Sequence, residues 1–141
     1  MKKTVIESIR EYFNKCPILD EEGLLSVDSL SKEPINYSID TMPADPIVFQ
    51  YVDGSSVNQH VFTFNSKEVF GSNTDNLENL GFYERLTEWI KEQNKIGHYP
   101  KLEGNRVPVK LEASTGGYLF DAETNTGTYQ IQLRLLYLEN Y

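Results

Sequence analysis

The last fourteen residues constrain the fold more than any other part of the chain. Every second position from Tyr129 to Tyr137 is apolar or aromatic, which is typical of a β-strand with one face in a hydrophobic core. The positions between them are polar as far as Arg134 and then become leucine at Leu136 and Leu138. The sequence therefore predicts a terminal strand that becomes apolar on both faces. Two-sided burial needs either more of the same domain or a partner chain.

Two segments repeat apolar residues at the spacing of an amphipathic helix. The first is predicted to end at Pro17, because proline lacks an amide hydrogen and disfavours a helical conformation in the residue before it. The second is predicted from Asn76 to Gly97, with Asp75 or Asn79 capping its start and Gly97 closing it. The core-facing positions are Val5, Ile9, Tyr12, Phe13 and Cys16 in the first helix, and Phe82, Leu86, Trp89, Ile90 and Gln93 in the second.

A β-hairpin is predicted between the helices. The apolar runs PIVFQYV and HVFTFNS flank the turn formers Asp53 and Gly54. In the second run, one face carries His60, Phe62 and Phe64, and one face should meet the core. Shorter strands are expected before this hairpin, at Leu25–Leu30 and at Tyr37–Asp40.

A second, longer hairpin is predicted after the second helix. Its first arm, VKLEASTGGYLF, is expected to bend at Ser114–Gly117, and DAETNTG should form the tip before the terminal strand. The order helix, short strands, hairpin, helix, hairpin favours an α+β fold. We predict a two-layer sandwich in which two main helices cover one face of a largely antiparallel or mixed sheet of about four to six strands. Its 141 residues suit a single domain, 1–141.

The formal net charge of −8 argues against specific nucleic-acid binding, because no segment concentrates the Lys and Arg that hold phosphates. The lone Cys16 excludes an internal disulfide. Charged residues interrupt the first segment where a secretion signal needs an apolar run, and no apolar run has the length of a membrane span. We therefore expect a protein that stays in the cytoplasm, with no membrane partner.

No catalytic, cofactor or metal site is predicted. His60 and His98 lack neighbours at the spacing of zinc ligands, and nothing in the sequence pairs either with Cys16 for nucleophilic catalysis. Ser114–Gly117 lacks the lysine of a phosphate-binding loop, and Asp20–Glu22 lacks the regular oxygen spacing of a calcium loop. The aromatic residues of the second helix are interpreted as core instead of a ligand pocket. A site assembled only in space stays an open alternative.

Five phrases, read in order, resemble one family. They are YVDG, GFYE, WIKEQN, GYLFD and YQIQLRLLY, and the resemblance extends from Ile6 to Glu139. In these phrases the chain resembles the small minor capsid or tail terminator proteins of long-tailed bacteriophages and prophages.

The resemblance implies a structural virion protein without enzymatic activity. Such proteins form a ring, here expected to hold six copies, at the head–tail junction. The ring ends the tail tube and contacts tail tube and head completion proteins. Before assembly the chain would lie in the bacterial cytoplasm. A neighbouring subunit would then cover the end of the terminal strand, so the candidate interface residues are Arg134, Leu136, Tyr137 and Leu138. An acidic lumen would let DNA pass without binding.

The alternative is a small acidic monomeric protein-binding module of the immunity or antitoxin kind. Acidity suits such a module because it attracts basic toxins.

Overall fold

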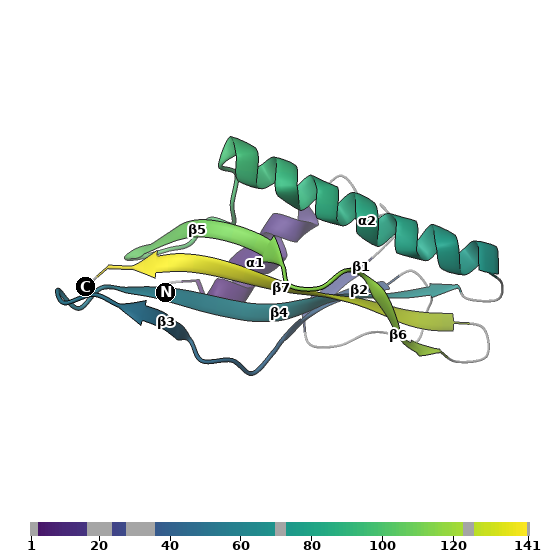
Figure 1. Cartoon of the computed structure of the whole chain (residues 1–141), viewed down its shortest axis with the longest axis horizontal. Helices are drawn as coiled ribbons and strands as arrows, with labels where there is room; N and C mark the ends of the chain where they lie inside the picture. The colour runs from purple at the N-terminus through teal and green to yellow at the C-terminus, as the bar shows by residue number, and fades with distance from the viewer. Residues whose placement is uncertain (1–2, 17–23, 28–35, 70–72, 123–125, 141) are drawn as a thin grey trace.

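Two antiparallel strands of fourteen residues each form the centre of the molecule (Figure 1). The computed structural model describes residues 3–16, 24–27, 36–69, 73–122 and 126–140. The two central strands pair along their whole length, from Ser56 opposite Glu139 to Val69 opposite Thr126. This pairing fixes which side chains share a face of the sheet.

In these described ranges, seven strand segments occupy five positions across the sheet, in the order β1-β2-β4-β7-β5. β2 and β3 both pair with β4, whereas β5 and β6 both pair with β7. All pairs are antiparallel except β1 with β2. The strands are β1 (Leu24–Val27), β2 (Asn36–Thr41), β3 (Ile47–Gln50), β4 (Ser56–Val69), β5 (Arg106–Ala113), β6 (Tyr118–Ala122) and β7 (Thr126–Glu139).

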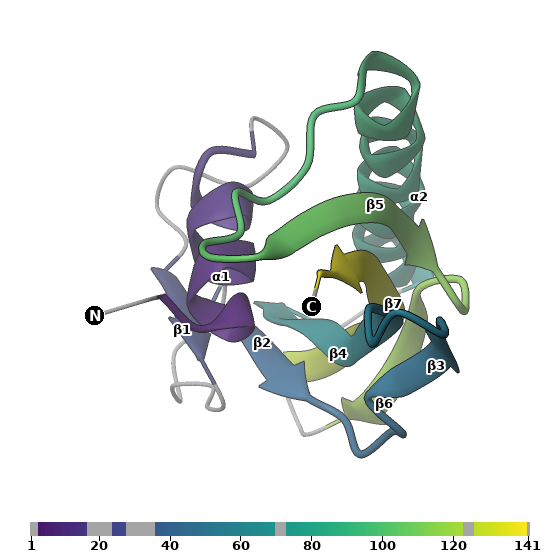
Figure 2. The same cartoon turned by 90° about the vertical axis from the view of Figure 1, so that its left-hand side faces the viewer.

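The helices α1 (Val5–Asn14) and α2 (Asn73–Ile96) join one face of this sheet in a single core. Figure 2 shows α1 beside β1 and β2, and α2 beyond β5 and β7. On β7 the alternate side chains from Tyr129 to Leu135 are fully buried, as the sequence predicts. The predicted α+β two-layer fold with a largely antiparallel sheet is confirmed, and the single parallel pair makes the sheet mixed.

Aromatic rings fill much of the core. The ring of Phe13 lies 6.1 Å from that of Phe62 and 5.6 Å from that of Phe64, so the predicted core face of β4 meets α1. Tyr83 on α2 is buried, and its hydroxyl group donates to the carbonyl oxygen of Tyr129 at 2.9 Å. The aromatic residues of α2 therefore belong to the core, because their rings and polar atoms find partners inside it.

The helix ends agree in part with the sequence predictions. Thr4 caps α1 by accepting from the amide of Glu7 at 3.3 Å, and the helix ends at Asn14. Gly97 follows α2 with a φ of 72°, as predicted. The predicted start of α2 is wrong, because the helix begins at Asn73 and so contains both residues expected to cap it. Gly81 does not interrupt the helix, since the residues after it pack into the core.

The strands also differ in extent from their predictions. β4 begins at Ser56, so it includes much of the loop expected between the runs PIVFQYV and HVFTFNS. The remaining turn is tight, and the amide of Tyr51 closes it by donating to the carbonyl of Ser55. The predicted strand Tyr37–Asp40 is confirmed within β2. That at Leu25–Leu30 is found as β1 up to Val27, and its last three positions lie outside the described residues. The first arm of the terminal hairpin bends at residues 114–117, which separates β5 from β6.

Gly117 in this bend lies against Tyr83 of α2. A Cβ atom at Gly117 would stand 2.3 Å from the Cβ atom of Tyr83, whereas one at Gly116 would meet nothing within 4 Å. We predict that Gly117→Ala lowers the free energy of unfolding by about 1–3 kcal/mol, because the helix and the bend must separate. Gly116→Ala is the matched control, with an expected change within about 0.5 kcal/mol. Equal urea midpoints for the two variants would contradict this close approach.

Leu133 lies at the centre of the core face of β7 and is fully buried. We predict that Leu133→Ala lowers the free energy of unfolding by about 2–5 kcal/mol, because it removes apolar contacts and leaves a cavity. Leu136→Ala, on the other face of the same strand, should cost clearly less because Leu136 is only partly buried. Urea unfolding followed by circular dichroism measures both changes. A larger loss for Leu136→Ala would reverse the assignment of faces.

Candidate functional site

The candidate interface residues of β7 do not all lie on one face of the sheet. Leu136 and Leu138 share the face turned away from the core with Arg134, and all three are partly buried. Tyr137 lies on the core face and is only 8% exposed. The alternation of a strand causes this separation, because consecutive side chains point to opposite faces. We call the face that carries Leu136 and Leu138 the second face.

An apolar row crosses the second face at one end of the sheet. Leu138 is paired with Val57 of β4 on one side and with Val107 of β5 on the other. Val57 is in turn paired with Phe49 of β3. Paired residues of neighbouring strands point to the same face, so these four side chains form a continuous row from β3 to β5.

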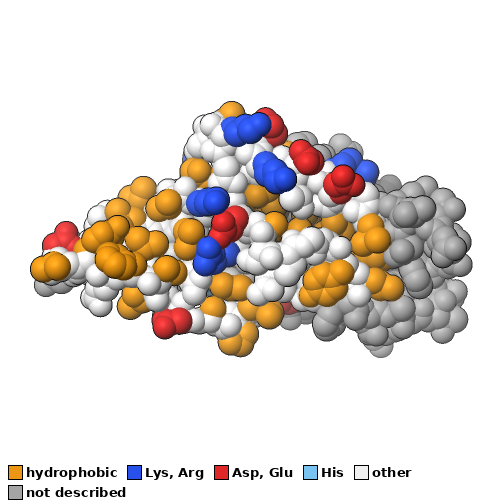
Figure 3. Space-filling view, viewed as in Figure 1, with side chains coloured by type: hydrophobic (Ala, Val, Ile, Leu, Met, Phe, Trp, Pro, Cys, Tyr) orange, Lys and Arg blue, Asp and Glu red, His pale blue; other side chains and the backbone are white. Residues whose placement is uncertain are grey.

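Exposed apolar residues surround this row. Ile47, Val48 and Phe49 are consecutive in β3, yet they are 45%, 50% and 56% exposed. Because consecutive side chains point to opposite faces, β3 is exposed on both. Figure 3 shows hydrophobic side chains gathered at this end of the molecule. We call this surface the apolar end. It consists of Ile47, Val48, Phe49, Tyr51, Val52, Val57, Val107, Val109, Leu136 and Leu138.

The sequence predicted a contact at the end of β7 but did not single out β3. The run PIVFQYV is apolar, which predicts a strand, but nothing in it tells whether that strand is buried. Exposed apolar residues gathered in one place commonly mark contacts with other proteins. The apolar end is therefore the candidate functional site.

A polar cluster borders the apolar end on the second face. Arg134 donates from Nε to Oε1 of Glu112 at 2.9 Å, and its Nη2 also contacts this oxygen. Its Nη1 donates to the side-chain oxygen of Gln59 at 3.3 Å. The other carboxylate oxygen of Glu112 lies 3.2 Å from Nζ of Lys110. Arg134 thus ties β4, β7 and β5 together within the chain, beside the partly buried Leu136.

Farther along the second face, buried polar residues replace the apolar ones. Ser38, Thr63 and Asn65 are at most 3% exposed. The amide group of Asn65 donates to Oδ2 of Asp40 at 2.6 Å and to Oγ1 of Thr63 at 3.1 Å. The second face therefore changes from hydrogen-bonded polar residues to apolar ones along the length of β4 and β7.

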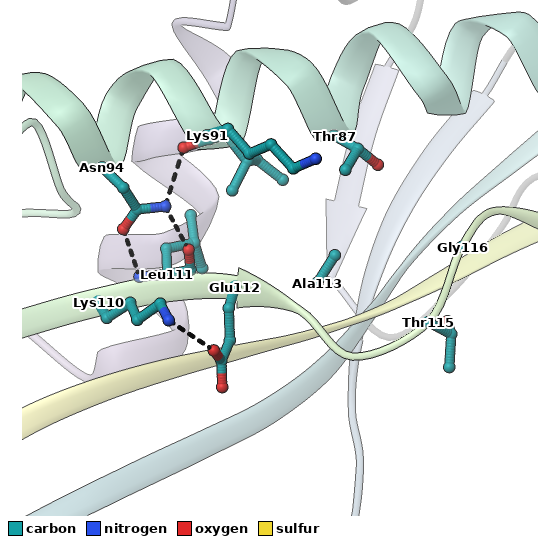
Figure 4. Close-up of a pocket in the computed structure, with 10 residues that line it drawn as sticks. Thr87, Lys91, Asn94, Lys110, Leu111, Glu112, Ala113, Thr115 and Gly116 are labelled. Atoms are coloured by element: carbon teal, nitrogen blue, oxygen red, sulfur yellow. Dashed lines mark hydrogen bonds and ion pairs between the residues drawn. The ribbon is translucent and has the colours of Figure 1, made fainter.

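A cavity of about 440 Å³ lies between α2 and β5 (Figure 4). At its wall, the side chain of Asn94 binds the backbone of Leu111 twice. Oδ1 accepts from the Leu111 amide at 3.1 Å, and Nδ2 donates to the Leu111 carbonyl at 2.5 Å. The threonines of the wall also form hydrogen bonds with the backbone. Thr87 donates to the carbonyl of Tyr83, and Thr115 accepts from the amide of Gln132.

Among the described residues of the cavity wall, none is a nucleophile with a base beside it that could activate it. The histidines lie in other places. His60 is 3.3 Å from the hydroxyl of Thr41, and Nδ1 of His98 is 2.7 Å from the side-chain oxygen of Gln93. Cys16 is buried. Within the described ranges, no three His, Cys, Asp or Glu residues gather as a metal site would require.

No helix in the described part of the chain is both long and apolar enough to cross a membrane. No protein-family model matches the chain, and a search of curated proteins finds no match.

The contact between Glu112 and Arg134 predicts a pH effect on stability. Hydrogen bonding to Arg134, and then to Lys110, holds the pKa of Glu112 below its ordinary value of 4.5. A carboxyl group with a lowered pKa stabilises the fold above its unfolded pKa, and this contribution is lost as the pH falls through the folded pKa. Glu112→Gln should therefore make the loss of stability below pH 4.5 shallower, by about 0.5–1 kcal/mol for a partly exposed pair.

Urea unfolding of wild type and Glu112→Gln over a pH series measures this difference. Glu88→Gln provides the same chemical change at an exposed position of α2. If the acid limb of the stability profile were the same with and without the Glu112 carboxyl group, the ion pair would not contribute to stability.

Proposed function

We propose that this chain is a structural protein of a bacteriophage or prophage that assembles with copies of itself into a ring at the head–tail junction. The ring ends the tail tube and presents a surface to head completion proteins. The protein acts in the virion, after synthesis in the bacterial cytoplasm. It has no enzymatic role in this proposal.

The apolar end is the observation that carries the proposal. Its row of paired side chains includes Leu138 and lies beside Leu136. These two leucines of the terminal strand lie on the second face and so do not contribute to the core. Contact between copies of the chain would bury such a surface, and burying apolar side chains drives association. The resemblance of the sequence phrases to tail terminators supports the same role.

The charge of the chain is compatible with a conduit for DNA. A net charge of −8 gives a ring of several copies a strongly negative total charge. Such a ring repels the phosphate backbone, so DNA passes through the lumen without being held.

We predict that Leu136→Asp stays folded but does not form the ring. Leu136 is partly buried on the second face, so the monomer tolerates the change, whereas a carboxylate in a desolvated contact between subunits is costly. Light scattering after gel filtration gives the assembly size, and circular dichroism confirms folding. Gln132→Asp is the matched control, because it places the same group on the same face of β7 away from the apolar row. An assembly of unchanged size in Leu136→Asp would contradict this contact.

The proposed function itself is tested with wild-type protein, alone and mixed with tail tube protein. We expect rings that cap the tubes and limit their length in electron micrographs. A protein that stays monomeric and leaves the tubes uncapped would overturn the proposal. A stable complex with one unrelated partner would instead support the binding-module alternative.

A further inference from the structure

The apolar end includes two strand edges, β3 and β5, which are protected against further strand pairing to different degrees. β5 carries three features that hinder pairing with another strand. Pro108 has no amide hydrogen to donate, the register with β7 shifts between Pro108 and Lys110, and Asn94 occupies both backbone groups of Leu111. Natural proteins use such features to prevent uncontrolled association of sheet edges.

The edge formed by β3 is less protected. It shares a register shift, between Ile47 and Phe49, and the amide of Ile47 donates to Oδ1 of Asp45 at 3.1 Å, but it has no proline within the strand. Its sequence, IVFQ, contains no proline and no charge, and all four residues are exposed. In the described part of the chain, β3 pairs only with β4. An uncharged, apolar and exposed edge is an association site unless something covers it. β3 is therefore the less protected of the two edges, and its exposed apolar side chains make it the stronger candidate for a contact.

The two edges also differ in charge. β3 is flanked by Asp45 and Asp53, which are both exposed. Hydrogen bonds from Ser55 lower the pKa of Asp53, so its carboxyl group is ionised at neutral pH. An acidic residue therefore stands at each end of the β3 surface.

The β5 edge carries the cations Arg106 and Lys110, of which Arg106 is paired with Glu139 of β7. Arg106 donates to the backbone carbonyl oxygens of Glu103 and Lys3. A backbone carbonyl bears no formal charge, so these bonds do not neutralise the guanidinium group. Lys110 shares the carboxylate of Glu112 with Arg134, so this group of two cations and one carboxylate retains one positive charge. Between these cations stand Val107 and Val109, which are 50% and 49% exposed.

We propose that the β3 edge of one copy packs against the β5 edge of the next copy. Apolar side chains of β3 then meet Val107 and Val109 together with Leu136 and Leu138, which are paired with β5 on the second face, while Asp45 and Asp53 face the cations of β5. This inference rests on the proposed self-assembly and assigns its two contact surfaces. The surfaces are different, so the contact is head-to-tail, and repeated contacts of this kind close into a ring when the rotation between copies allows. The protection of β5 makes the contact one between side chains instead of a continuous sheet.

Two single variants, each lacking one surface, test the proposal. Phe49→Asp removes the β3 surface, and Val109→Asp removes the β5 surface. Both side chains are about half exposed, so the folded monomer should persist. We expect each variant alone to be monomeric, with association at least roughly 100-fold weaker than in wild type, because each contact needs both surfaces. An equimolar mixture should form a complex of two chains and nothing larger, since each partner keeps one intact surface.

Light scattering after gel filtration distinguishes the outcomes. Ile96→Asp is the control, because Ile96 is a 71% exposed apolar residue at the end of α2, outside both edges, and this variant should assemble like wild type. If wild type assembles and either edge variant assembles equally well, the edge contact is wrong and the proposed ring stands. If the mixture of variants stays monomeric while wild type assembles, the contact is not between these two edges. A wild type that stays monomeric even at roughly millimolar concentration overturns both proposals.

Discussion

The pairing of β4 with β7 is the interaction on which the rest of the structure depends. It joins fourteen residues of each strand, and every other strand except β1 pairs directly with one of the two. Its register decides which side chains meet the helices and which meet the second face. A slip by one residue would exchange the two sets, exposing Leu133 and Leu135 and burying Arg134. The apolar end is therefore not an independent addition to the fold, because the register that builds the core also places Leu138 beside Val57 and Val107.

The sequence predicted those parts of the fold in which one face is buried and the other is not. The alternation from Tyr129 to Tyr137 and the apolar stripe of α2 are such cases, because one-sided burial leaves a period that can be read directly. The position of Tyr137 follows from the same alternation and places it opposite Leu136 and Leu138, although the three are neighbours in sequence. The exposure of β3 could not be read in this way. Its run of apolar residues has no period, and its burial depends on whether the helices reach as far as this edge of β4.

Other features depend on contacts between distant residues, which leave no local pattern. The amide of Asn94 resembles many polar groups on a helix surface until β5 passes beside it, seventeen positions later in the chain. The packing of Gly117 against Tyr83 likewise exists only because α2 crosses the bend between β5 and β6. Both contacts hold α2 to the edge of the sheet. The contact of Asn94 also makes β5 a poor partner for another strand even though Val107 and Val109 are exposed, because the backbone groups of Leu111 are already hydrogen-bonded.

Charge and apolar surface play separate parts in the proposed assembly. A net charge of −8 makes copies of the chain repel one another at a distance, which opposes indiscriminate association through the apolar end. At physiological ionic strength this repulsion is screened beyond about 8 Å, so near contact only the charges beside the two edges matter. The acidic residues beside β3 can meet the cations Arg106 and Lys110 beside β5, whereas two β3 edges would bring carboxylates together. Head-to-tail contact is therefore favoured over a symmetric pairing of β3 with itself. It is also the arrangement that lets every subunit of a ring cover its neighbour's apolar side chains.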